Sequence, residues 1–484
     1  MSDALQYIVL ALYLLSILFI FAYSVSQVGL VVAYRNKKRE NKPAENRPLP
    51  VPLPVVTVQL PVYNERYVIE RLIGAVLAFD YPKELLEIQI LDDSTDDTVE
   101  IIAKKVAQGL AAGFDIHHIR RADRRGFKAG ALAYGLTMAK GEYIAIFDAD
   151  FVPVPEFLRR SVPHFSDAEV GVVQSRWGHL NEDYSLITRM QAFGLDAHFT
   201  IEQVGRNVGG HFINFNGTAG IWRATTIQDA GGWSADTLTE DLDLSYRAQQ
   251  KGWRFVYLED LVSPAELPVT LPAVKSQQYR WTKGAAECAR KNLPAVWKSE
   301  NLSLPTKLYA SFHLLNSSIF VATLMTALLS VPMLALRLGW GWLTFFQLSL
   351  VIMAVFYWTA FRQKGGTFGQ FIATFPAFLT LMLGLSLHNA VAVVEGYLGR
   401  KTPFIRTPKF NVKQRGDRWQ SNTYNARKIP PLTWAEWGLA LYFLLGLVLG
   451  ITTQNYSALG FHTVLVLGYG FIAYYSVRHS LARS

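Results

Sequence analysis

Long, almost uncharged stretches constrain this chain more than any other feature of its sequence. Residues 4–33 form one such run, and residues 305–361, 366–396 and 433–477 are similarly rich in Leu, Phe, Val and Ala. A helix needs about 20 apolar residues to cross a hydrocarbon core about 30 Å thick. These runs therefore predict a multi-pass protein embedded in a lipid bilayer, with an N-terminal transmembrane helix within residues 1–40.

Basic residues gather beside the apolar runs. Arg35, Lys37, Lys38 and Arg39 follow the first run directly, which is the pattern that marks the cytosolic side of a membrane span. The N-terminus is therefore expected outside, and residues 41–300, which carry mixed charge, in the cytosol. This distribution accounts for the net charge of +9, and the sequence holds no basic groove motif or RNA-module signature, so we expect no nucleic acid partner.

Between the apolar regions, the pattern alternates strands with helices. We predict strands at residues 55–60, 87–93 and 141–150, with a helix at 65–79 and another after Asp96. Apolar strands separated by helices of this length indicate an α/β domain with a doubly wound, mostly parallel sheet. Such sheets bind ligands outside the C-terminal ends of their strands, so we look for the functional site at these three ends.

The first two strand ends carry polar turn residues. The first reads Pro61-Val62-Tyr63-Asn64-Glu65, in which proline stops the strand and the ring of Tyr63 can lie against a nucleobase. The second reads Asp92-Asp93-Ser94-Thr95. One interpretation of its acids is that they cap the helix that follows. The other is that the carboxylates contact a base or ribose hydroxyls.

The third strand end carries Asp148-Ala149-Asp150 after the apolar residues YIAIF. In an extended chain, residues i and i+2 face the same side, so the two carboxylates repel each other. A divalent ion relieves that repulsion, and Mg²⁺ or Mn²⁺ prefers such oxygen ligands. An ion held here would bridge the diphosphate of a nucleotide sugar as its glycosyl bond breaks.

Two later motifs complete the candidate site. Thr239-Glu240-Asp241 opens an acidic segment, and favourable charge at a helix N-terminus is one interpretation of it. For Asp241 we favour a general base that removes the proton of an acceptor hydroxyl. A base on the face opposite the leaving diphosphate gives a single displacement, which inverts the anomeric centre.

Gln277, Arg280 and Trp281 lie three to four residues apart, on neighbouring parts of one helical face. Arg280 can bind diphosphate oxygens through two hydrogen bonds, and Trp281 offers a flat platform for a sugar ring. The alternative is that Arg and Trp anchor a helix at the membrane surface, and both interpretations can hold together.

Taken in order, PVYNE, DDST, DAD, TED and QxxRW resemble the family 2 glycosyltransferases of GT-A fold, in particular the processive membrane branch that includes cellulose, hyaluronan and mannan synthases. The sequences of these motifs are most similar to those of the cellulose synthase-like A and C proteins of plants, as in LDDSTDDT, GFKAGAL and QQYRW. The likeness covers about residues 55–290. It implies inverting, metal-dependent transfer of a hexose from UDP-glucose or GDP-mannose to a growing β-1,4-linked glycan acceptor, with export through the membrane.

The resemblance also implies roles for single residues. Donor contacts would come from Pro61, Tyr63, Glu65, Asp92, Asp93, Lys128, Asp148 and Arg280. Asp148 and Asp150 would bind the metal, and Asp241 with Glu240 would form the catalytic pair. Acceptor contacts would come from Gln277, Trp281 and the segment Phe215, Asn216, Gly217 and Thr218, which stands where cellulose synthases carry a cysteine that this segment lacks.

A further likeness lies among the C-terminal helices. Phe404-Ile405-Arg406-Thr407-Pro408-Lys409 resembles the FxVTxK gating loop of cellulose synthases, with Arg406 in place of valine. The resemblance implies that residues 397–432 form a gating loop that includes Phe404 and closes over bound donor, with Thr407 and Lys409 in contact with the diphosphate. The alternative is an ordinary basic cytosolic loop.

A gating loop must lie on the same side of the membrane as the catalytic domain, which fixes the number of crossings between them as even. Residues 301–484 are expected to hold spans at about 308–335, 341–361, 433–453 and 458–477. We predict that residues 366–396 are re-entrant or interfacial, because a crossing there would place the loop outside.

Two other functions remain open from the sequence. A glycolipid synthase that transfers one sugar to ceramide or diacylglycerol would share every donor motif. A transporter or sugar-binding membrane protein without catalysis is a second alternative, and the intact DxD, TED and QxxRW motifs argue against it.

Overall fold

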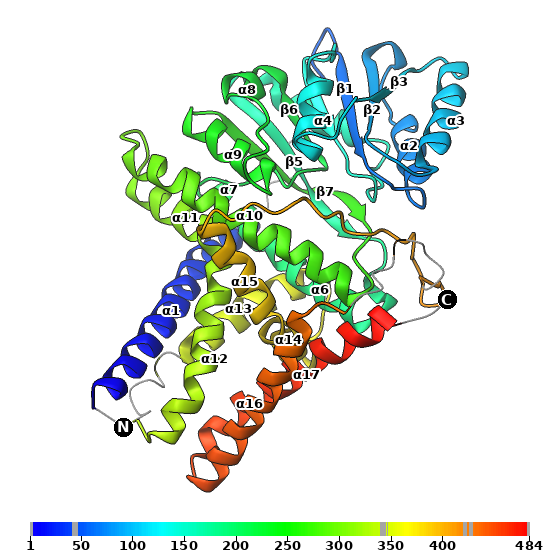
Figure 1. Cartoon of the computed structure of the whole chain (residues 1–484). Helices are drawn as coiled ribbons and strands as arrows, with labels where there is room; N and C mark the ends of the chain where they lie inside the picture. Colours follow the sequence, from blue (N-terminus) through cyan, green and yellow to red (C-terminus); the bar gives the residue numbers. More distant parts are fainter. Residues whose placement is uncertain are drawn as a thin grey trace.

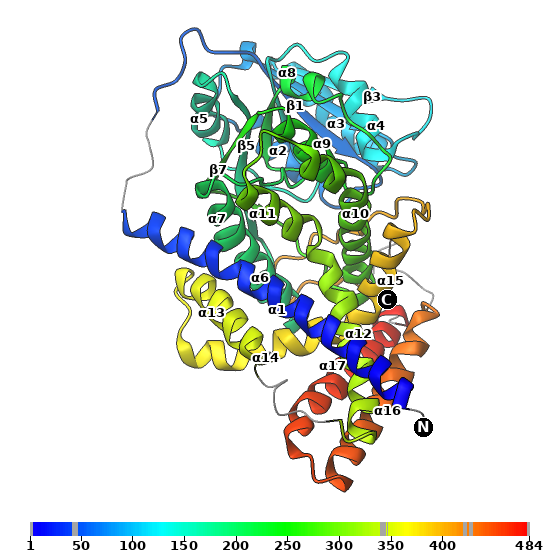
Figure 2. The same cartoon turned by 90° about the vertical axis from the view of Figure 1, so that its left-hand side faces the viewer.

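The computed structural model describes residues 3–40, 47–338, 345, 347–419, 424 and 429–481, and it has two parts. The sheet domain (residues 47–270) stands on a helical bundle made of α1 (Asp3–Arg39) and the helices after residue 270 (Figure 1). α1 runs obliquely away from the sheet domain along the bundle (Figure 2).

The seven strands follow the order β3-β2-β1-β4-β6-β5-β7. They are β1 (Val56–Val62), β2 (Leu86–Asp92), β3 (Asp115–Arg120), β4 (Tyr143–Ile146), β5 (Val170–His179), β6 (Gly220–Arg223) and β7 (Arg254–Ala265). Every neighbouring pair is parallel except the two made by β6, which runs antiparallel to β4 and β5. The predicted mostly parallel sheet is confirmed. The third predicted strand ends earlier than expected, so Asp148 and Asp150 lie in the turn that follows it.

Helices cover both faces of the sheet. α2 (Ile69–Leu77), α3 (Thr98–Ala111) and α5 (Phe157–Ser161) pack on one face, and α4 (Phe127–Leu136), α8 (Ala224–Asp229) and α9 (Glu240–Gln250) pack on the other. β4 shows why both faces are apolar, since Ala145 joins the first core and Ile144 and Ile146 join the second. The strands are therefore buried on both sides, as parallel sheets require.

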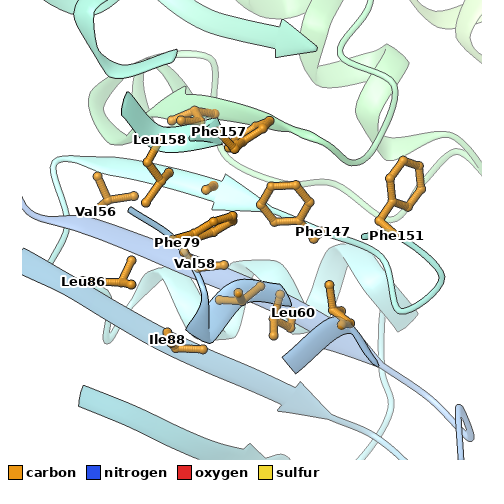
Figure 3. Packing of buried hydrophobic residues seen from close by; sticks show 14 of the residues in the cluster. Val56, Val58, Leu60, Phe79, Leu86, Ile88, Phe147, Phe151, Phe157 and Leu158 are labelled. Atoms are coloured by element: carbon orange, nitrogen blue, oxygen red, sulfur yellow. The ribbon is translucent and has the colours of Figure 1, made fainter. Parts of the chain in front are cut away.

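Phe147 anchors the core directly before the acidic turn. Its side chain has no exposed surface, and its ring centroid lies 5.8 Å from that of Phe79 and 4.8 Å from that of Phe157 (Figure 3). We expect Phe147→Ala to destabilise the domain by about 3–5 kcal/mol, because a cavity remains. The thermal unfolding midpoint of the purified protein in detergent should fall. Leu110→Ala, at a 54% exposed position on α3, should leave the midpoint unchanged; equal midpoints for the two variants would contradict this packing.

The bundle contains helices suited to a membrane. Its helices are α10 (Leu271–Lys298), α11 (Leu304–Leu314), α12 (Ile319–Ala335), α13 (Leu348–Gln363), α14 (Phe368–Gly384), α15 (Ser386–Tyr397), α16 (Leu432–Thr452) and α17 (Leu459–Leu481). Among the described residues, four helical segments are long and apolar enough to span a membrane: Asp3–Arg39, Asn316–Ala335, Leu432–Thr452 and Tyr456–Leu481. α13 has only 16 residues, and part of the crossing predicted at 341–361 falls outside the described residues. That crossing stays a prediction.

α14 and α15 form a pair bent by 50°. Before the pair, the Lys364 ammonium donates to Asp196 at 2.7 Å and to Glu182 at 2.8 Å, both in the sheet domain. After it, the Lys409 ammonium donates to Asp150 at 2.6 Å. Both ends of the bent pair therefore lead back to the sheet domain. This placement agrees with the re-entrant course predicted for residues 366–396, which itself stays a prediction.

A buried ion pair ties α10 to the last two helices. The Lys275 ammonium donates to Glu436 on α16 and to the Ser476 hydroxyl on α17, each at 2.7 Å. The side chains of Lys275 and Glu436 are 4% and 0% exposed. Removing one partner of such a pair leaves an uncompensated buried charge, so these three helices are expected to hold together as a unit.

Candidate active site

A cleft lies at the C-terminal ends of the strands, under α10 and the segment 404–409. Of the residues that the sequence motifs predict, seventeen line this cleft: Pro61, Tyr63, Glu65, Asp93, Lys128, Asp148, Asp150, Asn216, Gly217, Glu240, Asp241, Gln277, Arg280, Trp281, Phe404, Thr407 and Lys409. The structure thus brings together segments that stand more than 300 residues apart in the sequence. The strand ends of a parallel sheet meet at one edge, which accounts for the cleft residues that follow β1, β2 and β4.

Three predicted residues do not line the cleft. Asp92 is 1% exposed, and its carboxylate accepts from the backbone N–H of Ser94 and pairs with His118, each at 2.8 Å. Phe215 and Thr218 have no exposed surface. The direct ligand contacts predicted for these residues are not supported by their positions, and their contacts indicate that they support the site from behind.

The two acids of the DAD turn each pair with a lysine. Asp148 accepts from the Lys128 ammonium at 2.5 Å, and Asp150 accepts from Lys409 at 2.6 Å. Burial lowers the pKa of Lys128, but the carboxylates of Asp148, Glu240 and Asp241 raise it further, so the net shift is upward. Both aspartates line the same cleft and offer the oxygen ligands that Mg²⁺ or Mn²⁺ prefers, so this donor set fits such an ion.

A second acidic group lies at the other end of the sheet. Glu87, Asp115 and His117 have ligand atoms within 4.8 Å of one another, at the beginnings of β2 and β3. Lys140 donates to both carboxylates, from its backbone N–H to Glu87 at 2.8 Å and from its ammonium to Asp115 at 2.7 Å. These contacts satisfy the acids without a metal, and the group lies far from the cleft.

Asp241 sits in the first turn of α9, in space that a glycine leaves open. A Cβ atom added to Gly217, whose φ is +78°, would lie 2.8 Å from Oδ2 of Asp241. The carbonyl of Gly217 accepts from the Lys128 ammonium at 2.8 Å. Burial and the neighbouring charge of Glu240 raise the pKa of Asp241 to about 7, and burial also raises the pKa of Glu240. A carboxylate with a pKa near neutrality has the properties of a general base.

Gly217→Ala should therefore lower the turnover number by about 10- to 100-fold, because a small displacement of a reacting group is costly. The added methyl group would meet the Asp241 carboxylate and strain a left-handed backbone. Gly232→Ala is the matched control, since Gly232 also has a positive φ, +74°, but has open space where its Cβ would lie. Initial rates of sugar transfer measure both. Equal losses in the two variants would mean that backbone strain alone is responsible.

Arg280 and the segment 404–409 close the cleft together. The Arg280 guanidinium donates to the Thr407 hydroxyl at 2.7 Å and lies 4.6 Å from the ring centroid of Phe404. Its Nε is buried and has no hydrogen-bond partner among the described residues. An unpaired buried donor in a cleft is available to a ligand such as a phosphate oxygen.

Arg406, which replaces the valine of the family pattern, forms an ion pair with Glu65 at 2.7 Å. Burial raises the pKa of Glu65 to about 7, although the Arg406 charge opposes this shift. Lys409, three residues later, pairs with Asp150. Two ion pairs thus hold the segment 404–409 against the cleft. This is the position that a gating loop would need.

Several cleft residues were missed by the sequence motifs. The Arg124 guanidinium lies 3.4 Å from the ring centroid of Tyr63, so it covers one face of the ring on which a nucleobase was predicted to stack. Arg121 is not among the residues that line the cleft, but it binds both carboxylate oxygens of the cleft residue Asp93, at 3.0 and 2.5 Å. The basic run at residues 120–125 was the available signal for these two. Trp177 and His179 also line the cleft from the end of β5.

Comparison with known proteins agrees with this architecture. Residues 53–284 match the family described as "Glycosyltransferase like family 2". Glucomannan 4-beta-mannosyltransferase 2 of Arabidopsis thaliana is 36% identical over 402 residues, which cover 78% of this chain and 71% of the relative. Glucomannan 4-beta-mannosyltransferase 1 of Oryza sativa subsp. japonica is 42% identical over 265 residues, 54% of this chain, and that match spans about half of the relative's length, 51%.

Among solved structures, a mannosyltransferase from Pyrobaculum calidifontis in complex with GDP-Man and Mn²⁺ has a TM-score of 0.55. It is 19% identical, and the match covers 79% of this chain and 100% of that one. At this identity the likeness shows the fold alone, and it confirms the predicted GT-A fold. From the family match and the Arabidopsis relative, we conclude that this chain belongs to glycosyltransferase family 2 and is a glycosyltransferase.

Proposed function

We propose that this glycosyltransferase transfers mannose from GDP-mannose to the growing end of a β-1,4-linked mannan or glucomannan and passes the product into the membrane. The observation that carries the proposal is that Asp148, Asp150, Asp241 and Arg280 line one cleft. The choice of sugar is supported by two relatives named as glucomannan 4-beta-mannosyltransferases and by a fold neighbour in complex with GDP-Man.

The donor end of the cleft has the charges that a diphosphate needs. Arg280 and Lys128 can donate charged hydrogen bonds to its oxygens. The Nε atom of Arg280 has no hydrogen-bond partner among the described residues, so it is available for one of them. Asp148 and Asp150 would hold Mg²⁺ or Mn²⁺, which when bound offsets the negative charge that grows on the leaving diphosphate. The segment 404–409 would keep water from the reacting carbon while the donor is bound.

Asp241 performs the proton transfer in this proposal. Its carboxylate takes the proton of the acceptor hydroxyl as that oxygen bonds to C1 of the donor mannose. The bond between C1 and the phosphate oxygen breaks on the opposite face, and GDP leaves with that electron pair. One displacement inverts C1, so an α-linked donor gives a β-linked product. Gln277 and Trp281 would hold the acceptor sugar.

The membrane arrangement is also part of the proposal. Residues 1–40 would span the membrane with the N-terminus outside, residues 41–300 would form the cytosolic catalytic domain, and residues 301–484 would form the exit path with the gating loop at 397–432. Both ends of the bent α14–α15 pair lead to the sheet domain, which supports an even number of crossings before the loop.

The rate should depend on pH near neutrality. Asp241, with a pKa of about 7, is protonated below this value and then cannot accept a proton, so kcat/KM for the donor should fall about tenfold per pH unit on the acid side. Glu240→Gln removes the neighbouring charge that raises the Asp241 pKa, so the acid limb should move to lower pH. An acid limb unchanged in Glu240→Gln would contradict the assignment.

The decisive test is a product assay. Purified protein in lipid nanodiscs is incubated with labelled GDP-mannose or UDP-glucose and Mn²⁺, and the product is digested with β-1,4-mannanase or β-1,4-glucanase or extracted into organic solvent. Long, mannanase-sensitive polymer made from GDP-mannose is the expected result. A glucanase-sensitive polymer from UDP-glucose would mean that the transferred sugar is glucose and not mannose. A lipid-soluble monoglycoside would mean that the protein is a glycolipid synthase and not a polymer synthase.

A further inference from the structure

His179 is a cleft residue for which the donor chemistry described above has no use. It is the last residue of β5, two positions after Trp177, so both side chains belong to the same face of the strand. Both line the cleft, and the ring centroid of Trp177 lies 6.5 Å from that of Trp281. Two indole rings and an imidazole suit the apolar face and the hydroxyls of a sugar better than they suit a diphosphate.

A chain of hydrogen bonds holds this imidazole, and its first two members are buried. His179 Nε2 lies 3.1 Å from Oδ1 of Asp196, and the other carboxylate oxygen accepts from the Lys364 ammonium at 2.7 Å. The side chains of His179 and Asp196 are only 3% and 8% exposed. Lys364 follows α13, so the chain joins the cleft to the bundle.

The carboxylate decides which ring nitrogen is free. Burial raises the pKa of Asp196, but His179 and Lys364 lower it further, so the group stays ionised and only accepts hydrogen bonds. The Nε2 atom must therefore carry the hydrogen of the bond to Asp196, and this assignment of the tautomer rests on that hydrogen bond. In the neutral ring, Nδ1 then has a free lone pair, and no described residue donates to it.

We infer that His179 positions the acceptor sugar: its Nδ1 accepts a hydrogen bond from a hydroxyl of the acceptor's terminal sugar while Trp177 and Trp281 contact the sugar rings. Asp196 and Lys364 fix the tautomer and direction of the imidazole. The inference rests on the proposed function, because it takes the acceptor to be a sugar chain. It makes His179 a positioning residue, whereas Asp241 remains the base.

The test separates acceptor binding from donor chemistry. With a soluble β-1,4-mannooligosaccharide as acceptor, His179→Ala should raise the acceptor KM at least tenfold. The KM for GDP-mannose and the slow hydrolysis of GDP-mannose without acceptor should not change. His179→Asn should recover much of the loss, because its amide oxygen can accept near the position of Nδ1. Asp196→Asn should also raise the acceptor KM, since its amide can donate to Nε2 and so favour the tautomer that carries hydrogen on Nδ1.

His117→Ala is the matched control. His117 also pairs with an aspartate through Nε2, Asp115 at 2.7 Å, but it lies outside the cleft and should leave both KM values unchanged. An unchanged acceptor KM in His179→Ala, or an equal loss of transfer and donor hydrolysis without recovery in His179→Asn, would overturn the inference. Failure of the wild-type protein to use GDP-mannose concerns the proposed function alone, because the same variants can be compared with whichever donor and matching oligosaccharide the wild type accepts.

Discussion

Asp241→Asn should lower mannosyl transfer by about 10²- to 10⁴-fold, the usual contribution of a positioned general base, while GDP-mannose binding stays close to that of the wild type. The amide has the shape of the carboxylate and fits the space that Gly217 leaves beside it, but it cannot take the acceptor proton. Initial rates with labelled donor give the loss of transfer. Calorimetric titration of GDP-mannose in the presence of Mn²⁺ gives the affinity.

Asp236→Asn is the control for this change. Asp236 lies shortly before α9 and pairs with Lys291 at 2.8 Å, outside the cleft, so its loss should leave transfer unchanged. If Asp241→Asn binds GDP-mannose much more weakly than the wild type does, Asp241 contacts the donor instead, and the base must be sought elsewhere. Normal transfer by Asp241→Asn would exclude it as the base directly.

Arg280→Leu should lower kcat/KM for the donor by about 10²- to 10³-fold, the range found when one donor to a developing anion is removed. The variant loses the cation that Asp148 and Asp150 face across the cleft, and it also loses the hydrogen bond to Thr407. We therefore expect a second effect, faster trypsin cleavage within the segment 404–409. Arg280→Lys should fall between the wild type and Arg280→Leu, because lysine keeps the charge but not the paired geometry.

Arg290→Leu provides the comparison on the same helix. Arg290 is exposed, and among the described residues its guanidinium donates to the carbonyl of Tyr397 alone, at 3.5 Å. This variant should keep wild-type kcat/KM and wild-type cleavage by trypsin. Equal losses in Arg290→Leu and Arg280→Leu would show that the helix, and not the cleft residue, is responsible.

Part of the candidate active site could be predicted because its residues directly follow strands. The period of the apolar residues located β1, β2 and β4, and the rule that ligands bind at the C-terminal strand ends then selected Tyr63, Asp93 and Asp148. β6 could not be predicted in the same way. It has four residues, and its reversed direction depends on pairing with β4 and β5 rather than on its own pattern.

The sequence also could not show which side chains pair with each other across the fold. Asp92 was predicted to contact the donor, but His118 on the neighbouring strand takes its carboxylate, and only strand pairing brings the two together. Arg406 and Glu65 are separated by most of the chain, so nothing local indicates that they pair. Sequence patterns identify which side chains have suitable chemistry; the three-dimensional contacts decide which of those side chains remain free for a ligand.

α10 contributes to both the cleft and the helical bundle, and this has a consequence for any attempt to shorten the protein. The helix supplies Gln277, Arg280 and Trp281 to the cleft, and through Lys275 it is clamped to α16 and α17. A fragment that holds only residues 47–270 would keep the whole sheet but would lack the wall of the cleft that α10 provides. Because α10 belongs to both the cleft and the bundle, removing the bundle would also remove residues that line the cleft, and we expect such a fragment to lack transfer activity.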